Sequence, residues 1–153
     1  DNNTLVTGGY PHSIQVLGHS LIEFDNDDNI DENDWLKAIN HTAVEQQSKD
    51  FAEMYDFHGK TSAKEKILDA LAVVGSLSKQ EIMKYTNLRN IYQYLPDLIK
   101  KGSIKINKET DNVVLHSQLF RIAILTKIYD KIREGYLKDV INDKVKNGNG
   151  KKE

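Results

Sequence analysis

The sequence predicts a mainly α-helical protein in two parts, with one β-hairpin in the second part. Apolar residues recur at helical spacing along most of the chain, and short alternating apolar runs stand at residues 104–106 and 113–115. Residues 1–59 carry two basic and twelve acidic side chains, whereas residues 60–153 carry nineteen basic and eleven acidic ones. This asymmetry indicates two units with different partners, the basic one facing polyanions, or charges that only solubilise each unit.

The composition describes a folded protein of one ordinary domain or two small ones. The chain has 153 residues, of which 39% are hydrophobic and 29% charged. The absence of cysteine excludes disulfides, thiolate catalysis and cysteine-ligated metals. No apolar run approaches the roughly 20 residues that span a bilayer, and no signal peptide is visible. Because the chain begins at Asp1 without a methionine, we expect a cytoplasmic piece of a longer protein, with no membrane partner.

The first part is predicted to be a pair of helical segments. Pro11 suits the first turn of a helix, where its missing N–H costs nothing. Asp31 is the expected N-cap of the next segment, with Asp34 three residues later, and Trp35 is expected in the core. This segment is one long helix, or two with a break near residue 47, ending at Gly59. The apolar face of the first helix comprises Ile14, Leu17, Leu21 and Ile22, with Val16 and Phe24 beside it.

The second part reads as helix, helix-turn-helix and hairpin. A first helix ends at Gly75, and a capping box of Ser78 and Glu81 opens a short second helix. A third helix from Ile91 to Lys101 contains Pro96, which predicts a kink or a late helix start. With the hairpin after it, this is the order of a winged helix.

A last helix is predicted from Ser117 to Ile141, and the Lys/Asn/Gly-rich end is expected to be disordered. The predicted domains are therefore a helical unit over residues 1–59, a winged-helix domain with its C-terminal helix over 60–143, and a disordered tail over 144–153.

The segment Gly9-Tyr10-Pro11, followed by an apolar helix, resembles the Gly-x-Pro motif that opens the helical lid of P-loop ATPases. The similarity is to the archaeal-type ATPases and the wider STAND/AAA+ group. The run Leu115–Arg121 also resembles a segment after the wing in those ATPases, although their usual aspartate is absent. The resemblance implies that residues 1–59 are a lid and that Gly9, Tyr10, Pro11 and His12 lie near nucleotide in the parent protein. ATP and Mg²⁺ would then belong to the parent's missing core, which would itself be a partner of this chain.

The sequence contains no constellation that we interpret as catalytic, so the chain alone is not expected to be an enzyme or to hold a cofactor. Gly59-Lys60-Thr61 looks like the end of a phosphate-binding loop, but Met54 occupies the position of the required first glycine. His12 and His19 could share a helix face, yet a metal site needs at least one more ligand.

The third helix and the wing are the predicted DNA-binding surface. Arginine and amide side chains at the front of such a helix can read guanine and adenine edges, and lysines in the wing can neutralise phosphates. Asp97 lies on the same helix and would repel a phosphate. Two hypotheses stay open: a DNA-binding winged helix whose lid couples to nucleotide state, or a protein-interaction or autoinhibitory module. A homo-oligomer is compatible with both. The predicted DNA contacts are Arg89, Asn90, Gln93, Lys100, Lys105 and Lys108.

Overall fold

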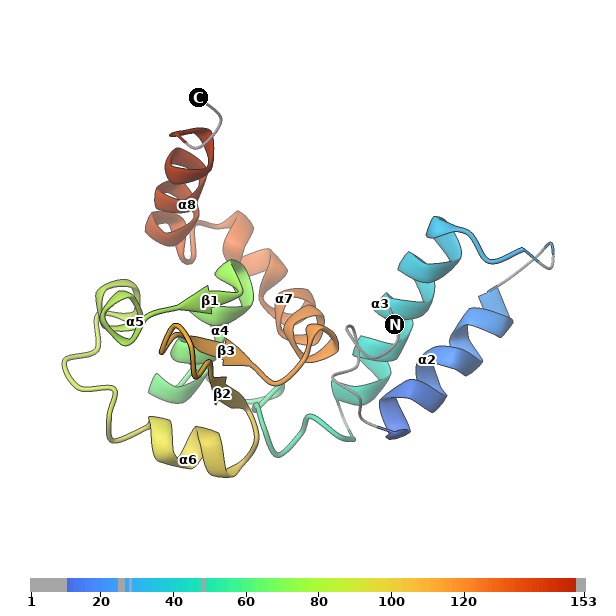
Figure 1. The fold of residues 1–153 in the computed structure, drawn as a ribbon, viewed down its shortest axis with the longest axis horizontal. Helices are drawn as coiled ribbons and strands as arrows, with labels where there is room; N and C mark the ends of the chain where they lie inside the picture. The colour runs from blue at the N-terminus through green and yellow to red at the C-terminus, as the bar shows by residue number, and fades with distance from the viewer. Residues whose placement is uncertain (1–10, 25–26, 28, 48, 151–153) are drawn as a thin grey trace.

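The structure is a computed structural model that describes residues 11–24, 27, 29–47 and 49–150 (Figure 1). It is mainly helical, as the sequence predicts, and has one three-stranded antiparallel sheet. Two helices, α2 and α3, pair on one side of the molecule, and the remaining elements form a larger group around the sheet. In chain order the elements are α2 (Pro11–Phe24), α3 (Glu32–Gln47), α4 (Ala63–Val74), β1 (Ser76–Leu77), α5 (Lys79–Thr86), α6 (Leu95–Lys100), β2 (Ile104–Ile106), β3 (Val113–Leu115), α7 (Gln118–Arg133) and α8 (Lys138–Gly150).

The pair of α2 and α3 has its own small apolar core. Leu17 and Leu21 of α2 are buried against Ala38 of α3, and Trp35 packs partly buried beside them, close to its predicted place in the core. Helix α2 begins at Pro11, as predicted. Ile22 was predicted on the buried face but is 76% exposed, because it lies about 100° around the helix from Leu21 and so points away from α3.

The predicted cap of α3 is present. The backbone N–H of Asp34 donates to the Asp31 carboxylate at 3.0 Å, and the N–H of Asp31 donates to the Asp34 carboxylate at 3.0 Å. The reciprocal bonds satisfy two amides that the first turn of a helix leaves without intrahelical partners.

Helix α3 ends at Gln47, where one of the two predicted alternatives placed a break. Residues 49–59 form turns, so the helix that both alternatives continued to Gly59 is not there. The amide of Phe51 donates back to the carbonyl of Gln46 at 3.0 Å, which closes the helix end. Phe51, Tyr55 and Phe57 are buried in the core of the larger group. These side chains therefore pack with the elements after residue 60; the division into domains at residue 59 stays a prediction.

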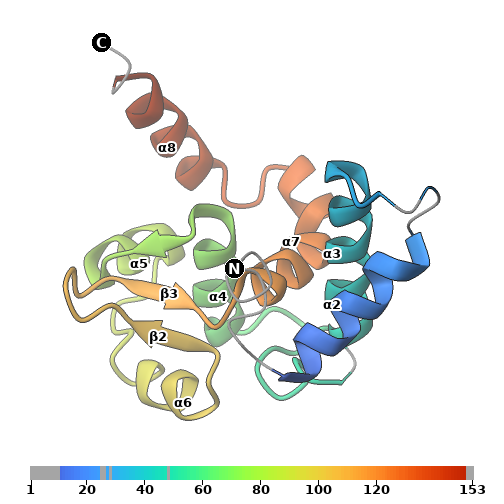
Figure 2. The ribbon, with the colours of Figure 1, turned by 45° about the vertical axis from the view of Figure 1, so that its right-hand side comes forward.

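The sheet has the strand order β1-β3-β2, with both pairs antiparallel (Figure 2). Strand β3 lies in the middle, with Val114 opposite Ser76 on one side and opposite Lys105 on the other. Alternation places Leu77, Val113 and Leu115 in the core. The hairpin of β2 and β3 is confirmed, whereas β1 was not predicted because two residues cannot display an alternating pattern.

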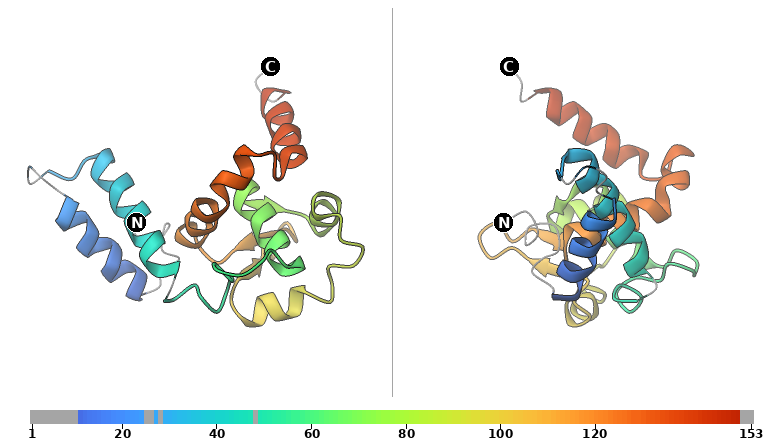
Figure 3. Two further views of the ribbon diagram at one scale, coloured as in Figure 1. Left: turned by 180° about the vertical axis from the view of Figure 1, so that it is seen from behind. Right: turned by 90° about the vertical axis from the view of Figure 1, so that its right-hand side faces the viewer.

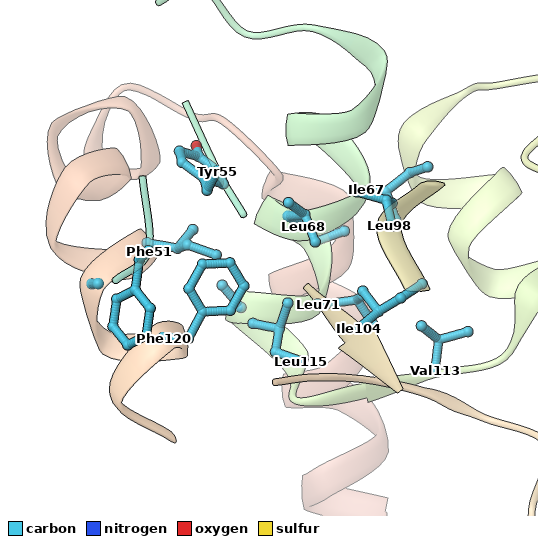
Figure 4. Close-up of a cluster of buried hydrophobic side chains, with 14 of the residues drawn as sticks. Phe51, Tyr55, Ile67, Leu68, Leu71, Leu98, Ile104, Val113, Leu115 and Phe120 are labelled. Atoms are coloured by element: carbon cyan, nitrogen blue, oxygen red, sulfur yellow. The ribbon is translucent and has the colours of Figure 1, made fainter. Parts of the chain in front are cut away.

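The main core lies between α4, α7, the sheet and the turn segment around Phe51 (Figure 4). The Phe51 and Phe120 rings pack with centroids 5.1 Å apart. The buried side chain of His116 lies edge-on to both rings, at 6.3 Å from each centroid. Residues that are far apart in the chain thus meet in one apolar cluster.

The predicted single C-terminal helix is two helices, α7 and α8, and Figure 3 shows α8 running away from the body. Gly135 and Leu137 between them have positive φ angles of 106° and 59°, which a continuous helix does not allow. Beyond this joint, α8 is helical to Gly150, where the sequence predicted disorder from Lys144. Val140 is 1% exposed and anchors the start of α8, and a helix propagates readily from an anchored turn.

Candidate nucleic-acid interface

The predicted DNA contacts lie in three neighbouring segments: the connection from α5 to α6, α6 itself, and the hairpin of β2 and β3. The connection and the hairpin turn lie at the end of the molecule opposite α2 and α3 (Figures 1 and 2). Helix α6 leads into β2 through a tight turn, in which the Ser103 amide donates to the Leu98 carbonyl at 2.9 Å. The fold therefore brings the connection and the hairpin turn to one end of the molecule, whereas Lys100 lies in the last turn of α6.

Helix α5 is positioned by the predicted capping box. The Ser78 hydroxyl accepts from the Glu81 amide at 3.1 Å, and the Glu81 carboxylate accepts from the Ser78 amide at 3.1 Å. Ile82 is fully buried and fixes the helix to the core. Asn87 ends α5 in the left-handed conformation, with φ 58°, and so turns the chain toward α6.

The connection before α6 is a turn anchored by Ile91, which is fully buried. The amides of Tyr94 and Leu95 both donate to the Ile91 carbonyl, at 2.9 and 3.1 Å. The side-chain carbonyl of Asn90 accepts from the Tyr92 amide at 3.0 Å. One side of the Asn90 carboxamide is therefore used to shape the turn, which leaves its NH₂ group for any base contact.

The third helix of the second part is shorter than predicted, since α6 covers only Leu95–Lys100 with Pro96 in its first turn. The late start is one of the two outcomes that the proline predicted. Arg89, Asn90 and Gln93 consequently lie before the helix and not on its front. Ile99 is 47% exposed, because Leu95 and Leu98 provide the buried side of this short helix.

The cations at this end of the molecule divide into paired and unpaired ones. Lys79 lies 3.6 Å from Asp111, and Lys84 lies 3.2 Å from Asp143. Among the residues that the structure describes, the four predicted cationic contacts are exposed and form no ion pair with an acidic side chain. These four residues are Arg89, Lys100, Lys105 and Lys108.

Asp97 is the acidic residue on α6 that the sequence analysis expected to repel a phosphate. Its negative charge is compensated in the structure. Its carboxylate accepts from the ammonium group of Lys64 at the start of α4 and lies 3.4 Å from that of Lys101. The hydrogen bond from Lys64, with Lys101 close by, holds the pKa of Asp97 below its usual range. The expected repulsion of a phosphate is thus opposed by two adjacent cations.

The hairpin turn presents Lys108 next to a well-defined cap. The Asn107 side chain accepts from the Glu109 amide at 2.9 Å, and Asp111 has a φ of 59°. The contact between Asp111 and Lys79 ties the turn to the start of α5. The turn is therefore held against α5, the helix that precedes the α5–α6 connection.

Lys105 projects from the outer face of the sheet, at the β2 position that pairs with Val114. Burial of the His116 ring, and to a smaller extent the nearby Lys105, lowers the pKa of His116 below its ordinary value. His116 is therefore a neutral core residue at neutral pH.

The residues predicted near nucleotide are only partly described. Gly9 and Tyr10 lie outside the described residues. Pro11 and His12 form the first two positions of α2, but their side chains lie outside the described part as well.

The loop that looks like the end of a phosphate-binding motif binds its own carboxylate. The amides of His58 and Gly59 donate to the Asp56 side chain at 3.0 and 2.8 Å. These bonds hold the pKa of Asp56 below its ordinary value. An internal anion thus already uses these backbone donors, and the segment before the loop consists of turns.

A serine, a histidine and an acid meet between α2 and α3, but their geometry does not match a catalytic triad. The Ser20 hydroxyl lies 3.1 Å from Nδ1 of His41, and Glu45 approaches the same nitrogen at 3.9 Å. A relay needs the serine and the acid on opposite ring nitrogens. Ser20 is also 1% exposed, so it is inaccessible to a substrate.

The structure reveals one buried polar cluster that the sequence reasoning missed. Asp69 of α4 is fully buried, and its two carboxylate oxygens accept from the hydroxyls of Tyr55 and Tyr136, each at 2.6 Å. Burial raises the pKa of Asp69 despite these bonds, and it raises the pKa of both tyrosines. The cluster ties the segment after α3 and the α7–α8 joint to α4. The only signal in the sequence is an aspartate inside the apolar run of residues 67–74.

Within the described residues, no group of three or more His, Asp or Glu side chains could hold a metal ion. No helix in the described ranges is long and apolar enough to cross a membrane. In comparisons with known proteins, no family model, no curated protein sequence and no solved structure matches this chain.

Proposed function

We propose that residues 60–143 form a winged helix that binds double-stranded DNA through the α5–α6 connection, α6 and the β2–β3 hairpin. The order of helices and strands, with a hairpin after the third helix of the group, supports the winged-helix interpretation. In such a domain the third helix and the wing approach the DNA.

One observation carries the proposal. The four predicted cationic contacts, Arg89, Lys100, Lys105 and Lys108, are exposed and lack an acidic partner among the described residues. Two acidic side chains of this region, Asp97 and Asp111, by contrast form ion pairs with lysines. Unpaired cations attract a polyanion and release counterions when it binds.

A titration of a fluorescent duplex with the protein tests the proposal, using anisotropy between 50 and 200 mM salt. Binding should weaken steeply with salt, and Arg89→Ala and Lys105→Ala should each reduce the slope of log K against log salt by about 1. The control is Lys37→Ala, which removes an exposed lysine of α3 at the other end of the molecule. Absence of binding at 50 mM salt, or binding that salt does not weaken, contradicts the proposal.

A second candidate function, docking of a protein, is favoured by the apolar surface of the same region. Tyr92 is 58% and Ile99 47% exposed, and Pro96 is exposed between them. Tyr92 lies in the α5–α6 connection, and Pro96 and Ile99 lie on α6. Exposed apolar side chains gathered in one segment are typical of a surface that contacts a partner protein. Size-exclusion chromatography with the ATPase portion of a parent protein tests this function: a complex that Ile99→Ser disrupts, with no DNA binding, favours docking.

The relation to a P-loop ATPase is a proposal that depends on the resemblance of residues 9–11 and 115–121. Its support from the fold is that a helix begins at Pro11. In this proposal α2 and α3 belong to a lid that couples nucleotide state in the parent to the winged helix. Calorimetry with ATP and Mg²⁺ should detect at most weak binding by this chain, whose loop amides at His58 and Gly59 are already bonded to Asp56. Tight binding contradicts this view.

A further inference from the structure

We infer that Lys64 and Lys101 are further phosphate-binding residues of the candidate interface, and that Asp97 is the positioning residue that holds them beside α6. This inference rests on the proposed DNA binding and extends it to residues that the sequence did not select. It also reverses the role expected of Asp97, which the sequence marks as a group that repels DNA.

The first step of the argument is geometric. Asp97 lies on α6, Lys64 lies in the first turn of α4, and Lys101 follows the end of α6. The Asp97 carboxylate accepts a hydrogen bond from Lys64 and lies 3.4 Å from the Lys101 ammonium group. One acidic group on the candidate interface therefore gathers two cations from different elements.

The second step concerns charge. Two lysines and one carboxylate leave one net positive charge in the cluster. An ammonium group has three N–H donors, so each lysine keeps donors for a phosphate while one points at Asp97. The side chains of Lys64 and Lys101 are 37% and 46% exposed, and both therefore reach solvent at this surface.

The third step concerns the position of Lys64. A cation in the first turn of a helix is opposed by the helix dipole, whose N-terminal end is positive. Lys64 occupies such a place in α4, and the Ser62 side chain forms no cap bond there. The contact with Asp97 offsets this cost. It also restrains the long Lys64 side chain before DNA binds, so that less conformational entropy is lost on binding.

The same duplex titration tests the inference with three variants. Lys64→Ala and Lys101→Ala should each lower the salt slope by about 0.9 and weaken binding about fivefold at 0.15 M salt. Asp97→Asn removes a negative charge but should still weaken binding about two- to fivefold. The reason is that the side chains of Lys64 and Lys101 are then no longer held in place by the Asp97 carboxylate. In a double-mutant cycle, Lys64→Ala should cost less affinity when Asp97 is already replaced.

Glu45→Gln is the matched control, because it frees Lys49, which follows α3, from a similar ion pair away from the interface. It should leave affinity and slope unchanged. Thermal unfolding followed by circular dichroism establishes that each variant is folded, since exposed ion pairs contribute little to stability.

The outcomes separate the inference from the proposed function. If Asp97→Asn binds DNA more tightly than wild type, or if the two lysine variants keep the wild-type slope while Arg89→Ala lowers it, the inference is wrong and DNA binding stands. If the wild-type protein does not bind the duplex at 50 mM salt, both fail.

Discussion

Replacing Tyr55 by phenylalanine should destabilise the protein strongly for the loss of a single oxygen atom. The Tyr55 hydroxyl donates at 2.6 Å to the carboxylate of Asp69, which is fully buried. A hydrogen bond to a charged group contributes about 1.5–3 kcal/mol, and its loss leaves a buried carboxylate oxygen without that donor. We expect a loss of about 2 kcal/mol in the free energy of unfolding, or a melting temperature about 4–8 °C lower for a chain of this size.

The size of this loss should depend on pH. Burial raises the pKa of Asp69 above its ordinary value of 3.8, so the native state takes up a proton at a higher pH than the unfolded chain does. The contribution of Asp69 to stability is therefore fully present below pH 3.8 and falls as pH rises through the native pKa. Above that pKa the Asp69 carboxylate is charged, and the stability of the native state then depends most on the hydrogen bonds from the hydroxyls of Tyr55 and Tyr136. Tyr55→Phe should therefore cost more at pH 8 than at pH 4.

Urea unfolding followed by circular dichroism at 222 nm, at both pH values, measures the effect. Tyr129→Phe is the matched control, because Tyr129 is 59% exposed and its loss of a hydroxyl should change stability by less than about 0.5 kcal/mol. A Tyr55→Phe variant as stable as wild type at pH 8 would refute the reasoning. An equal loss at both pH values would show that the charge of Asp69 plays no part.

Three further predictions concern the core, a cap and a titrating group, each measured by urea or thermal unfolding. Phe51→Ala should cost about 3–5 kcal/mol, because the ring is 1% exposed and packs on Phe120; a loss below about 1 kcal/mol would place Phe51 outside the core. Ser78→Ala should cost about 1 kcal/mol by removing the α5 capping box, whereas the exposed Ser76→Ala should be neutral. Burial lowers the pKa of His116 below 6.5, so its contribution to stability is present above pH 6.5 and is lost as pH falls through the native pKa. His116→Gln should reduce the loss of stability between pH 8 and pH 5, and an unchanged pH dependence would contradict this assignment.

Local signals predicted many of the element ends in this protein. The capping boxes at Asp31 and Ser78 and the N-cap at Ser117 are all present, the last with the Phe120 amide donating to the serine hydroxyl at 3.2 Å. Such caps depend on residues three positions apart, so a sequence displays them directly. The hairpin of β2 and β3 was visible for the same reason, since its alternation lies within a few residues.

The wrong predictions of secondary structure fall where contacts with residues far away in the chain outweigh the helical spacing of nearby residues. The apolar spacing of Phe51 and Tyr55 is compatible with a helix, but their burial against α4 and α7 pulls the segment into turns. The spacing around Tyr136 likewise predicted a continuous helix. There the bond from its hydroxyl to Asp69 accompanies the break at Gly135 and Leu137. Tertiary packing outweighs helix propensity at both places.

At the candidate interface, the four cations that the sequence selected are exposed, whereas the role of Asp97 could not be judged from the sequence. From the sequence alone, an acidic residue beside a predicted DNA contact is expected to repel the phosphates, because only its neighbours along the chain are known. The lysine that compensates it most closely, Lys64, is 33 residues away and meets it only in the folded protein.

The sequence by itself therefore determined the helical class, the hairpin, the caps and the segregation of charge, because each of these depends on composition or on residues a few positions apart. Only the tertiary structure decided that residues 49–59 form turns, where α7 ends, which carboxylate is buried beneath two tyrosines, and which cations at the candidate interface stay unpaired among the described residues. The physical reason is that burial and ion pairing depend on distances in space, and packing brings together residues that the sequence keeps far apart.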